Sequence, residues 1–157
     1  LIYAATNLGM FAVIIAVSRK TRSGSVASLR GLFSYAPGLG ALATIFLASL
    51  AGIPPLGGWV GKFAAFQSML TSGSGWGYAL ALIGAVNSVV AFGYYGSVMR
   101  EIWMKPVPDG DTTPIRIPGS LKLALVITAV ATLVLGILPG VAMHFGDIAQ
   151  LTSAFGG

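Results

Sequence analysis

The stretch Ser49-Leu-Ala-Gly-Ile-Pro-Pro-Leu-Gly-Gly-Trp-Val-Gly-Lys-Phe63 places two consecutive prolines and a lone lysine inside one long apolar segment, residues 38 to 71. A proline inside a helix removes a backbone donor and clashes with the preceding turn, and the residue before it is pushed out of the helical region. A helix arriving from residue 38 is therefore predicted to break at Pro54 and Pro55. In lipid, an interrupted backbone survives only where protein or a water-lined cavity covers it, so the break and Lys62 together mark a candidate site for moving an ion.

The composition is that of an integral membrane protein. Of the 157 residues, 55% are hydrophobic and only 8% are charged, whereas a soluble domain carries roughly 25% charged residues. The net charge is +5, but the basic residues lie between apolar runs instead of on a patch with interleaved aromatics, which argues against nucleic acid as a partner. The absence of cysteine excludes disulfides, thiol catalysis and thiolate-ligated iron–sulfur clusters. Because the chain begins with Leu1 inside an apolar run, we expect it to be the C-terminal part of a longer membrane protein.

Four apolar segments are predicted to cross the membrane, namely residues 1–18, 38–71, 76–99 and 120–143. A helix climbs about 1.5 Å per residue and the hydrocarbon core is about 30 Å thick, so the first, third and fourth segments each match one spanning helix. The second would be about 51 Å long as a continuous helix. Pro54 and Pro55 predict two half-helices there, roughly 38–52 and 57–71, and a single kinked helix is the alternative. The expected fold class is an all-α, polytopic single membrane domain, residues 1–157, whose second span is discontinuous.

The basic residues predict the orientation in the membrane. Eight of the nine Lys and Arg residues flank or fill two connections, about 19–37 and 100–119, and these are Arg19, Lys20, Arg22, Arg30, Arg100, Lys105, Arg116 and Lys122. The short connection between the second and third segments has none. The positive-inside rule therefore places the two basic connections in the cytoplasm, and both ends of the chain outside.

Lys62 is the ninth basic residue and the only charged side chain well inside a predicted span. A charged lysine at the centre of a membrane helix costs roughly 2.5 to 3.5 kcal/mol, so it is expected to face protein or water and to have a partner or a role. One interpretation is a proton relay that exchanges its proton when a neighbouring charge changes. The alternatives are a static ion pair with an acidic residue on another helix, or a side chain that extends to the membrane interface.

Asn7, Gln67, Asn87 and Ser88 are the strongest remaining polar groups within the spans. Each is predicted to form a hydrogen bond between helices, worth about 0.6 kcal/mol on average, or to belong to a water-bridged proton path with Lys62. The sequence contains no nucleotide motif, nucleophile–base pair or metal cluster, so neither bond-making chemistry nor a metal site is predicted.

Two other features are expected to be structural. Gly57 and Gly61 form a small-xxx-small pair, which favours close packing of the second half-helix. His144, near Asp147, is predicted to lie on the outer surface.

Four stretches carry a family resemblance, and one of them is the Gly31-Leu-Phe connection before Pro37. The segment from Ser49 to Phe63 resembles the signature of antiporter-like subunits of respiratory complex I and of multisubunit cation/proton antiporters. The runs Tyr3-Ala-Ala-Thr-Asn-Leu-Gly-Met-Phe-Ala-Val13 and Asn87-Ser-Val-Val-Ala-Phe-Gly-Tyr-Tyr95 are similar to the N-type subunit of the proton-pumping NADH–quinone oxidoreductase. The resemblance covers nearly the whole chain and implies the last four of that family's fourteen spans. By this match, Lys62 stands at the position of the family's terminal proton-relay lysine.

The resemblance implies a place in a respiratory electron-transport chain. The chain would belong to a proton-translocating NADH–quinone oxidoreductase in a bacterial plasma membrane, with Lys62 as the catalytic relay. NAD, FMN, iron–sulfur clusters and quinone would be bound by partner subunits, and this chain would contain no cofactor and no redox site. Its partners would be the other membrane and peripheral subunits and the lipid bilayer. The alternatives are a subunit of a multisubunit cation/proton antiporter, or a structural membrane subunit in which Lys62 holds a static ion pair.

Overall fold

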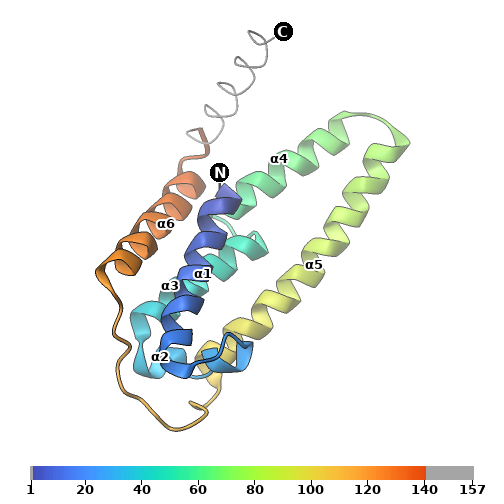
Figure 1. The fold of residues 1–157 in the computed structure, drawn as a ribbon. Helices are drawn as coiled ribbons and strands as arrows, with labels where there is room; N and C mark the ends of the chain where they lie inside the picture. The colour runs from blue at the N-terminus through green and yellow to red at the C-terminus, as the bar shows by residue number, and fades with distance from the viewer. Residues whose placement is uncertain (1, 141–157) are drawn as a thin grey trace.

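The structure, a computed structural model, describes residues 2–140, and this part of the chain is helical without any strand (Figure 1). The elements in order are α1 (Ile2–Thr21), the short helices η1 (Val26–Leu29) and α2 (Leu32–Tyr35), α3 (Pro37–Ala51), α4 (Gly57–Thr71), α5 (Gly75–Met104) and α6 (Gly119–Ile137). Helices α1, α5 and α6 are each long and apolar enough to cross a membrane, and α3 is a shorter apolar helix. The predicted fold class, a polytopic helical membrane protein, is confirmed.

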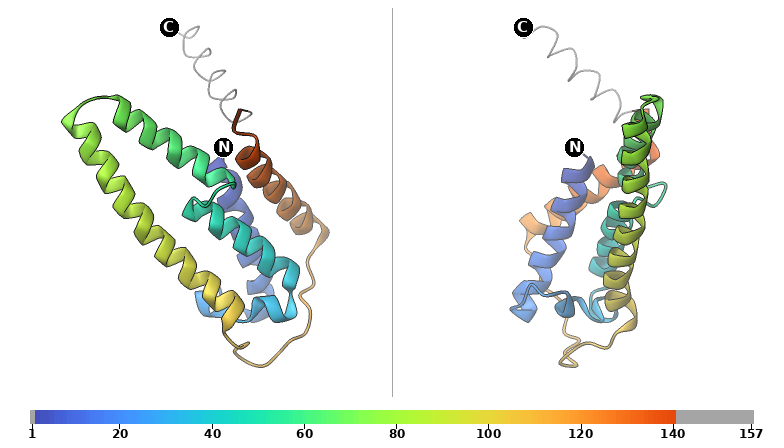
Figure 2. Two further views of the ribbon diagram at one scale, coloured as in Figure 1. Left: turned by 180° about the vertical axis from the view of Figure 1, so that it is seen from behind. Right: turned by 90° about the vertical axis from the view of Figure 1, so that its right-hand side faces the viewer.

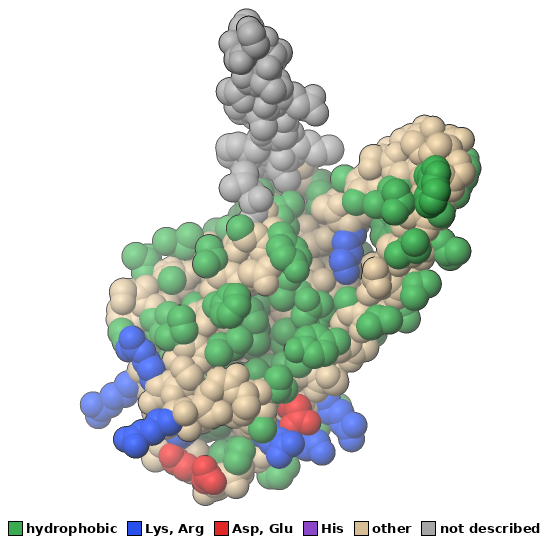
Figure 3. All heavy atoms as spheres, turned by 45° about the vertical axis from the view of Figure 1, so that its right-hand side comes forward, with side chains coloured by type: hydrophobic (Ala, Val, Ile, Leu, Met, Phe, Trp, Pro, Cys, Tyr) green, Lys and Arg blue, Asp and Glu red, His purple; other side chains and the backbone are tan. Residues whose placement is uncertain are grey.

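The long connections lie at one end of the helices (Figures 1 and 2). The segment with η1 and α2 is at this end, next to the connection that joins α5 to α6, whereas the turn between α4 and α5 lies at the opposite end. Acidic side chains and most of the basic ones gather at the end with the long connections (Figure 3). The helical body between the two ends presents mostly apolar side chains.

The core forms where α1 packs against α3 and α6. Val13 of α1, Phe46 of α3 and Ile102 of α5 are fully buried in it. Gly9 allows the close approach of α1 to α3, because a Cβ at this position would overlap the ring of Phe46. By contrast, α4 buries only Gly57, and the hairpin of α4 and α5 projects beyond the rest of the described chain (Figure 1).

Two predicted boundaries differ from the structure. The third connection begins at Lys105 instead of residue 100, because Arg100 and Glu101 continue α5 and only the residue before Pro106 leaves the helical region. Glu101 accepts a 2.6 Å ion-pair hydrogen bond from Arg30. The first connection, predicted as a loop, contains η1 and α2, whose apolar side chains such as Leu32 reach the core. The prediction for His144 and Asp147, and the end of the fourth predicted segment, fall outside the described residues.

Lys20, at the end of α1, binds the connection between α5 and α6 through hydrogen bonds and an ion pair. Its Nζ donates to the carbonyl oxygens of Asp111, at 2.8 Å, and Thr113, at 2.6 Å, and lies 3.5 Å from the Asp111 carboxylate. The ammonium also lies 4.2 Å from the ring centroid of Tyr35. Hydrogen bonds from Thr113, followed by the charge of Lys20, lower the pKa of Asp111, and burial, followed by the charge of Asp111, raises the pKa of Tyr35.

Lys20→Met is expected to release this connection. The substitution removes two hydrogen bonds and a cation–π contact, so amide exchange of residues 109–115 at neutral pH should become roughly threefold to tenfold faster. Arg19→Met is the matched control, since Arg19 is exposed one residue earlier on the same helix. Because folding lowers the pKa of Asp111, the carboxylate's contribution is present above its usual value of 3.8 and is lost only as the pH falls below it. Equal exchange rates in the two variants at neutral pH would contradict the role of Lys20.

Candidate functional site at the helix break

Helix α3 ends at Ala51 with a hydrogen-bonded C-terminal cap, and α4 begins only at Gly57. Gly52 follows α3 with φ of 89°, a left-handed conformation that favours glycine. Its N–H donates to the carbonyl of Ser49 at 2.9 Å, and the N–H of Ile53 donates to that of Ala48 at 3.0 Å. These bonds form a Schellman motif. The next helix begins at Gly57, after a cis peptide bond between Pro54 and Pro55.

Lys62 folds back across this break. Its Nζ donates a 2.8 Å hydrogen bond to the carbonyl oxygen of Ala51, the last residue of α3. The side chain crosses Gly52 so closely that a Cβ there would lie 2.8 Å from Lys62 Cδ. The end of α3 carries a partial negative charge from its free carbonyl groups, so an ammonium is stabilised at this position. Among residues 2–140, no carboxylate forms a salt bridge with Lys62.

A chain of buried hydroxyl groups lies beside Lys62. The Oγ of Ser49 accepts a 3.0 Å hydrogen bond from the N–H of Gly58, in the first turn of α4. Ser49 Oγ lies 3.4 Å from Thr6 Oγ1, which in turn lies 3.3 Å from Thr132 Oγ1. Thr6 is 1% exposed and the other two hydroxyl residues are fully buried. The three side chains come from α1, α3 and α6, so they join three helices to the start of a fourth.

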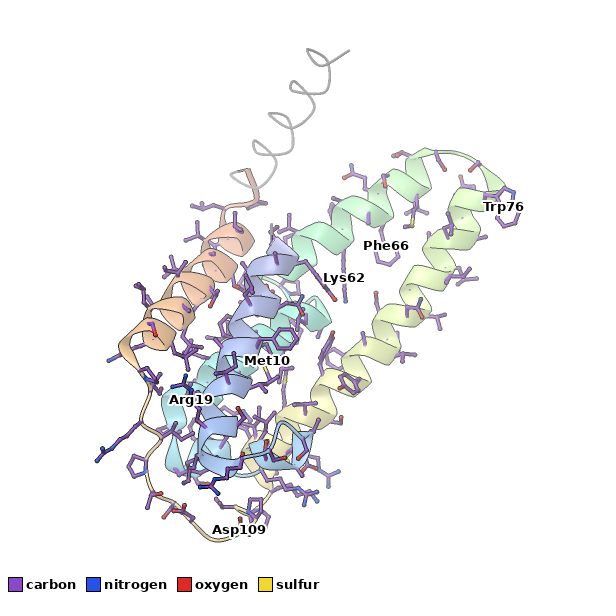
Figure 4. All side chains as sticks on the ribbon, in the orientation of Figure 1. Met10, Arg19, Lys62, Phe66, Trp76 and Asp109 are labelled. Atoms are coloured by element: carbon purple, nitrogen blue, oxygen red, sulfur yellow. The ribbon has the colours of Figure 1, made fainter. Side chains whose placement is uncertain are left out.

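A cavity of about 240 Å³ connects the lysine with two of these hydroxyl residues. Its lining includes Thr6, Ser49, Gly58 and Lys62. This volume exceeds the roughly 30 Å³ that one water molecule occupies in the liquid several-fold, although most of the lining is apolar. Figure 4 shows Lys62 on α4, facing the space between α4, α1 and α5 and far from the charged end of the molecule.

The other predicted polar residues do not line this cavity. Asn7 donates to the carbonyl of Tyr3 in its own helix and lines a different cavity, and Ser88 donates to the carbonyl of Gly84 in its own helix. Gln67 and Asn87 are exposed on the described structure. Their membership of a proton path stays a prediction.

The break meets α6 through glycines. A Cβ on Gly57 would lie 2.8 Å from Ile2 Cγ2, and one on Gly136 would overlap the backbone of Pro55 and Gly57. Gly61 has nothing within 4 Å of such a Cβ. Close packing therefore occurs at Gly57, as predicted, but not at Gly61.

The family model for the transmembrane region of NADH:quinone oxidoreductases and Mrp antiporters matches residues 1–90, more than half of the chain. The chain belongs to this family. The matched residues include the helix break and Lys62, and the membership, together with the three long apolar helices, makes the protein an integral, multi-pass membrane protein of a bacterial type.

Several bacterial family members are similar over most of the chain. NADH-quinone oxidoreductase subunit N of Heliobacterium modesticaldum is 39% identical over 140 residues, which are 89% of this chain and 29% of that protein. Subunit N 2 of Sorangium cellulosum is 34% identical over 145 residues, 91% of this chain and 28% of that protein. The chain thus spans under a third of the length of these relatives.

A solved structure with this architecture is respiratory complex I from Thermus thermophilus with bound aureothin. One of its chains superposes with a TM-score of 0.64 and 29% sequence identity, over 88% of this chain and 32% of that chain. The overall helical fold is therefore shared with a chain of that complex.

Proposed function

We propose that this chain forms part of a proton-translocating membrane subunit of an NADH–quinone oxidoreductase, in which Lys62 is the proton relay. The observation that carries the proposal is the position of Lys62. Among residues 2–140 it is the one Lys or Arg within the apolar body, and it lies at a helix break beside a cavity. An ionisable group in such a place is typical of ion pathways in membrane proteins. The similarity to proteins named subunit N supports the choice of complex.

The relay would use the negative end of α3. In the protonated state, the Lys62 ammonium donates to the carbonyl of Ala51 and is stabilised by the helix dipole. When a positive charge arrives nearby, the ammonium would pass a proton to a water molecule in the cavity and become a neutral amine. A proton from the opposite side would then restore the ammonium. NADH oxidation and quinone reduction would take place in partner subunits, which would bind NAD, FMN, the iron–sulfur clusters and quinone.

The orientation follows from the two basic connections. Both lie at the same end of the described structure (Figures 1 and 3), and the positive-inside rule assigns this end to the cytoplasm. Lys62 would then lie between the cytoplasmic end and the outer turn that joins α4 to α5.

A cation/proton antiporter is the second candidate function, because the matching family model also includes Mrp antiporters. Such a protein would need no flavin or iron–sulfur partners. Purification through a tag on the full-length protein distinguishes the two. We expect flavin and iron–sulfur absorbance in the purified complex and NADH-driven acidification in sealed vesicles. Purification without these chromophores, combined with sodium-gradient-driven proton movement, would favour the antiporter.

A further inference from the structure

The hydroxyl groups of Thr6, Ser49 and Thr132 form an ordered hydrogen-bond chain. Thr6 Oγ1 lies 3.0 Å from the carbonyl oxygen of Ile2, to which it can only donate. With its single proton used there, Thr6 Oγ1 accepts from Ser49 and Thr132. Ser49 in turn accepts from the N–H of Gly58. Every hydroxyl proton thus has an acceptor, although the whole cluster is buried.

Packing alone does not require hydroxyl groups at these three positions. Valine has the shape of threonine and fills apolar space between helices without the cost of burying a polar group. A cluster of satisfied hydroxyls instead fixes relative positions, because each bond requires its two helices at one separation. Here the bonds join α1, α3 and α6 to the first turn of α4.

Two hydrogen bonds across the break pair polar groups of α3 with polar groups of α4. Ser49 of α3 accepts from the first turn of α4, where N–H groups lack partners within the helix, and Lys62 of α4 donates to the last carbonyl of α3, where acceptors lack partners. The start of α4 therefore holds the position of the helix that carries Lys62, one turn further along.

We propose that Thr6, Ser49 and Thr132 are positioning residues that hold the start of α4 so that the ammonium of Lys62, which lines the cavity, reaches the Ala51 carbonyl. This inference rests on the proposed relay function of Lys62. Loss of a cluster hydroxyl would let the first turn of α4 shift, and the ammonium would then occupy a range of positions relative to α3. The relay would work more slowly and over a different pH range.

The test uses the full-length protein in the assembled complex, in sealed inside-out vesicles. Thr6→Val and Thr132→Val remove one hydroxyl each with little change of shape. The matched control is Thr128→Val, since Thr128 is a buried threonine one turn earlier on α6 that bonds only to carbonyls of its own helix. Thr6→Ser restores the hydroxyl. The measurement is the rate of NADH-driven acidification between about pH 6 and 9, divided by the amount of assembled complex.

Thr6→Val and Thr132→Val are expected to lower the acidification rate roughly tenfold, the change that loss of one hydrogen bond can produce. They should also displace the pH profile by on the order of half a unit to one unit. Thr128→Val and Thr6→Ser should keep the profile of the unmodified protein.

Two outcomes would overturn the positioning role. One is that the cluster variants and Thr128→Val share a single pH profile. The other is that both cluster variants fail to assemble while Thr128→Val assembles, because the cluster is then needed for folding alone. The Lys62→Met variant separates this inference from the relay proposal. If Lys62→Met acidifies normally, Lys62 is not a relay. If Lys62→Met does not acidify but the cluster variants behave like the unmodified protein, only the positioning role is disproved.

Discussion

Lys62→Met in the full-length protein is expected to reduce NADH-driven acidification by at least about tenfold, within the range that a positioned proton-transfer group contributes. Methionine retains an unbranched side chain of similar length but has no proton to exchange. It also removes the 2.8 Å hydrogen bond to the Ala51 carbonyl. Because methionine keeps the apolar stem that crosses Gly52, the packing at the break is retained and the complex should still assemble.

Lys62→Arg sharpens this prediction. Arginine keeps the positive charge at the negative end of α3, but its guanidinium does not give up a proton in proteins. A role that is only electrostatic or structural would therefore tolerate arginine, and a relay would not. We expect Lys62→Arg to assemble and to acidify as slowly as Lys62→Met. Normal acidification in either assembled variant would disprove the relay, and loss of assembly in Lys62→Met alone would support the structural interpretation.

Proline and charge made the break and its lysine predictable from the sequence, because both act locally. Pro54 and Pro55 exclude helical hydrogen bonds wherever they occur, and a lysine in an apolar segment needs a partner wherever that segment lies. The partner itself was not predictable. Lys62 bonds to the backbone carbonyl of Ala51, eleven residues earlier, and every residue carries such a group.

The hydroxyl cluster of Thr6, Ser49 and Thr132 could not be predicted from the sequence for a different reason. Threonine and serine are common in membrane helices, where they usually bond to their own backbone. Thr6 is 43 residues from Ser49 and 126 residues from Thr132, so their meeting depends on how α1, α3 and α6 pack. The one available signal was that Ser49 lies within the stretch that contains the break. Gln67 and Asn87 were predicted as site residues because amides are more polar than hydroxyls, yet neither residue lines the cavity.

Gly58→Ala is expected to have the largest effect on stability. A Cβ at this position would overlap the carbonyl oxygen of Ser49 and lie 2.7 Å from its carbonyl carbon. Backbone atoms cannot rotate away as a flexible side chain can, so the first turn of α4 must move away from α3. That movement would break the hydrogen bond from Gly58 to Ser49 Oγ and open the hydroxyl cluster. We expect a loss on the order of 3 kcal/mol in the free energy of unfolding, from overpacking together with an unpaired, partly buried N–H.

Gly61→Ala is the matched control on the same helix. A Cβ at Gly61 meets nothing within 4 Å in the described structure, and alanine is favoured over glycine within a helix by up to about 1 kcal/mol. The measurements are the thermal unfolding temperature of the full-length protein in detergent and the amount of the protein in the membrane. Both should fall sharply for Gly58→Ala and stay level or rise for Gly61→Ala. Equal behaviour of the two variants would mean that α3 and α4 do not approach each other at Ser49 and Gly58. In that case Lys62 would also lose the geometry that places its ammonium on the end of α3.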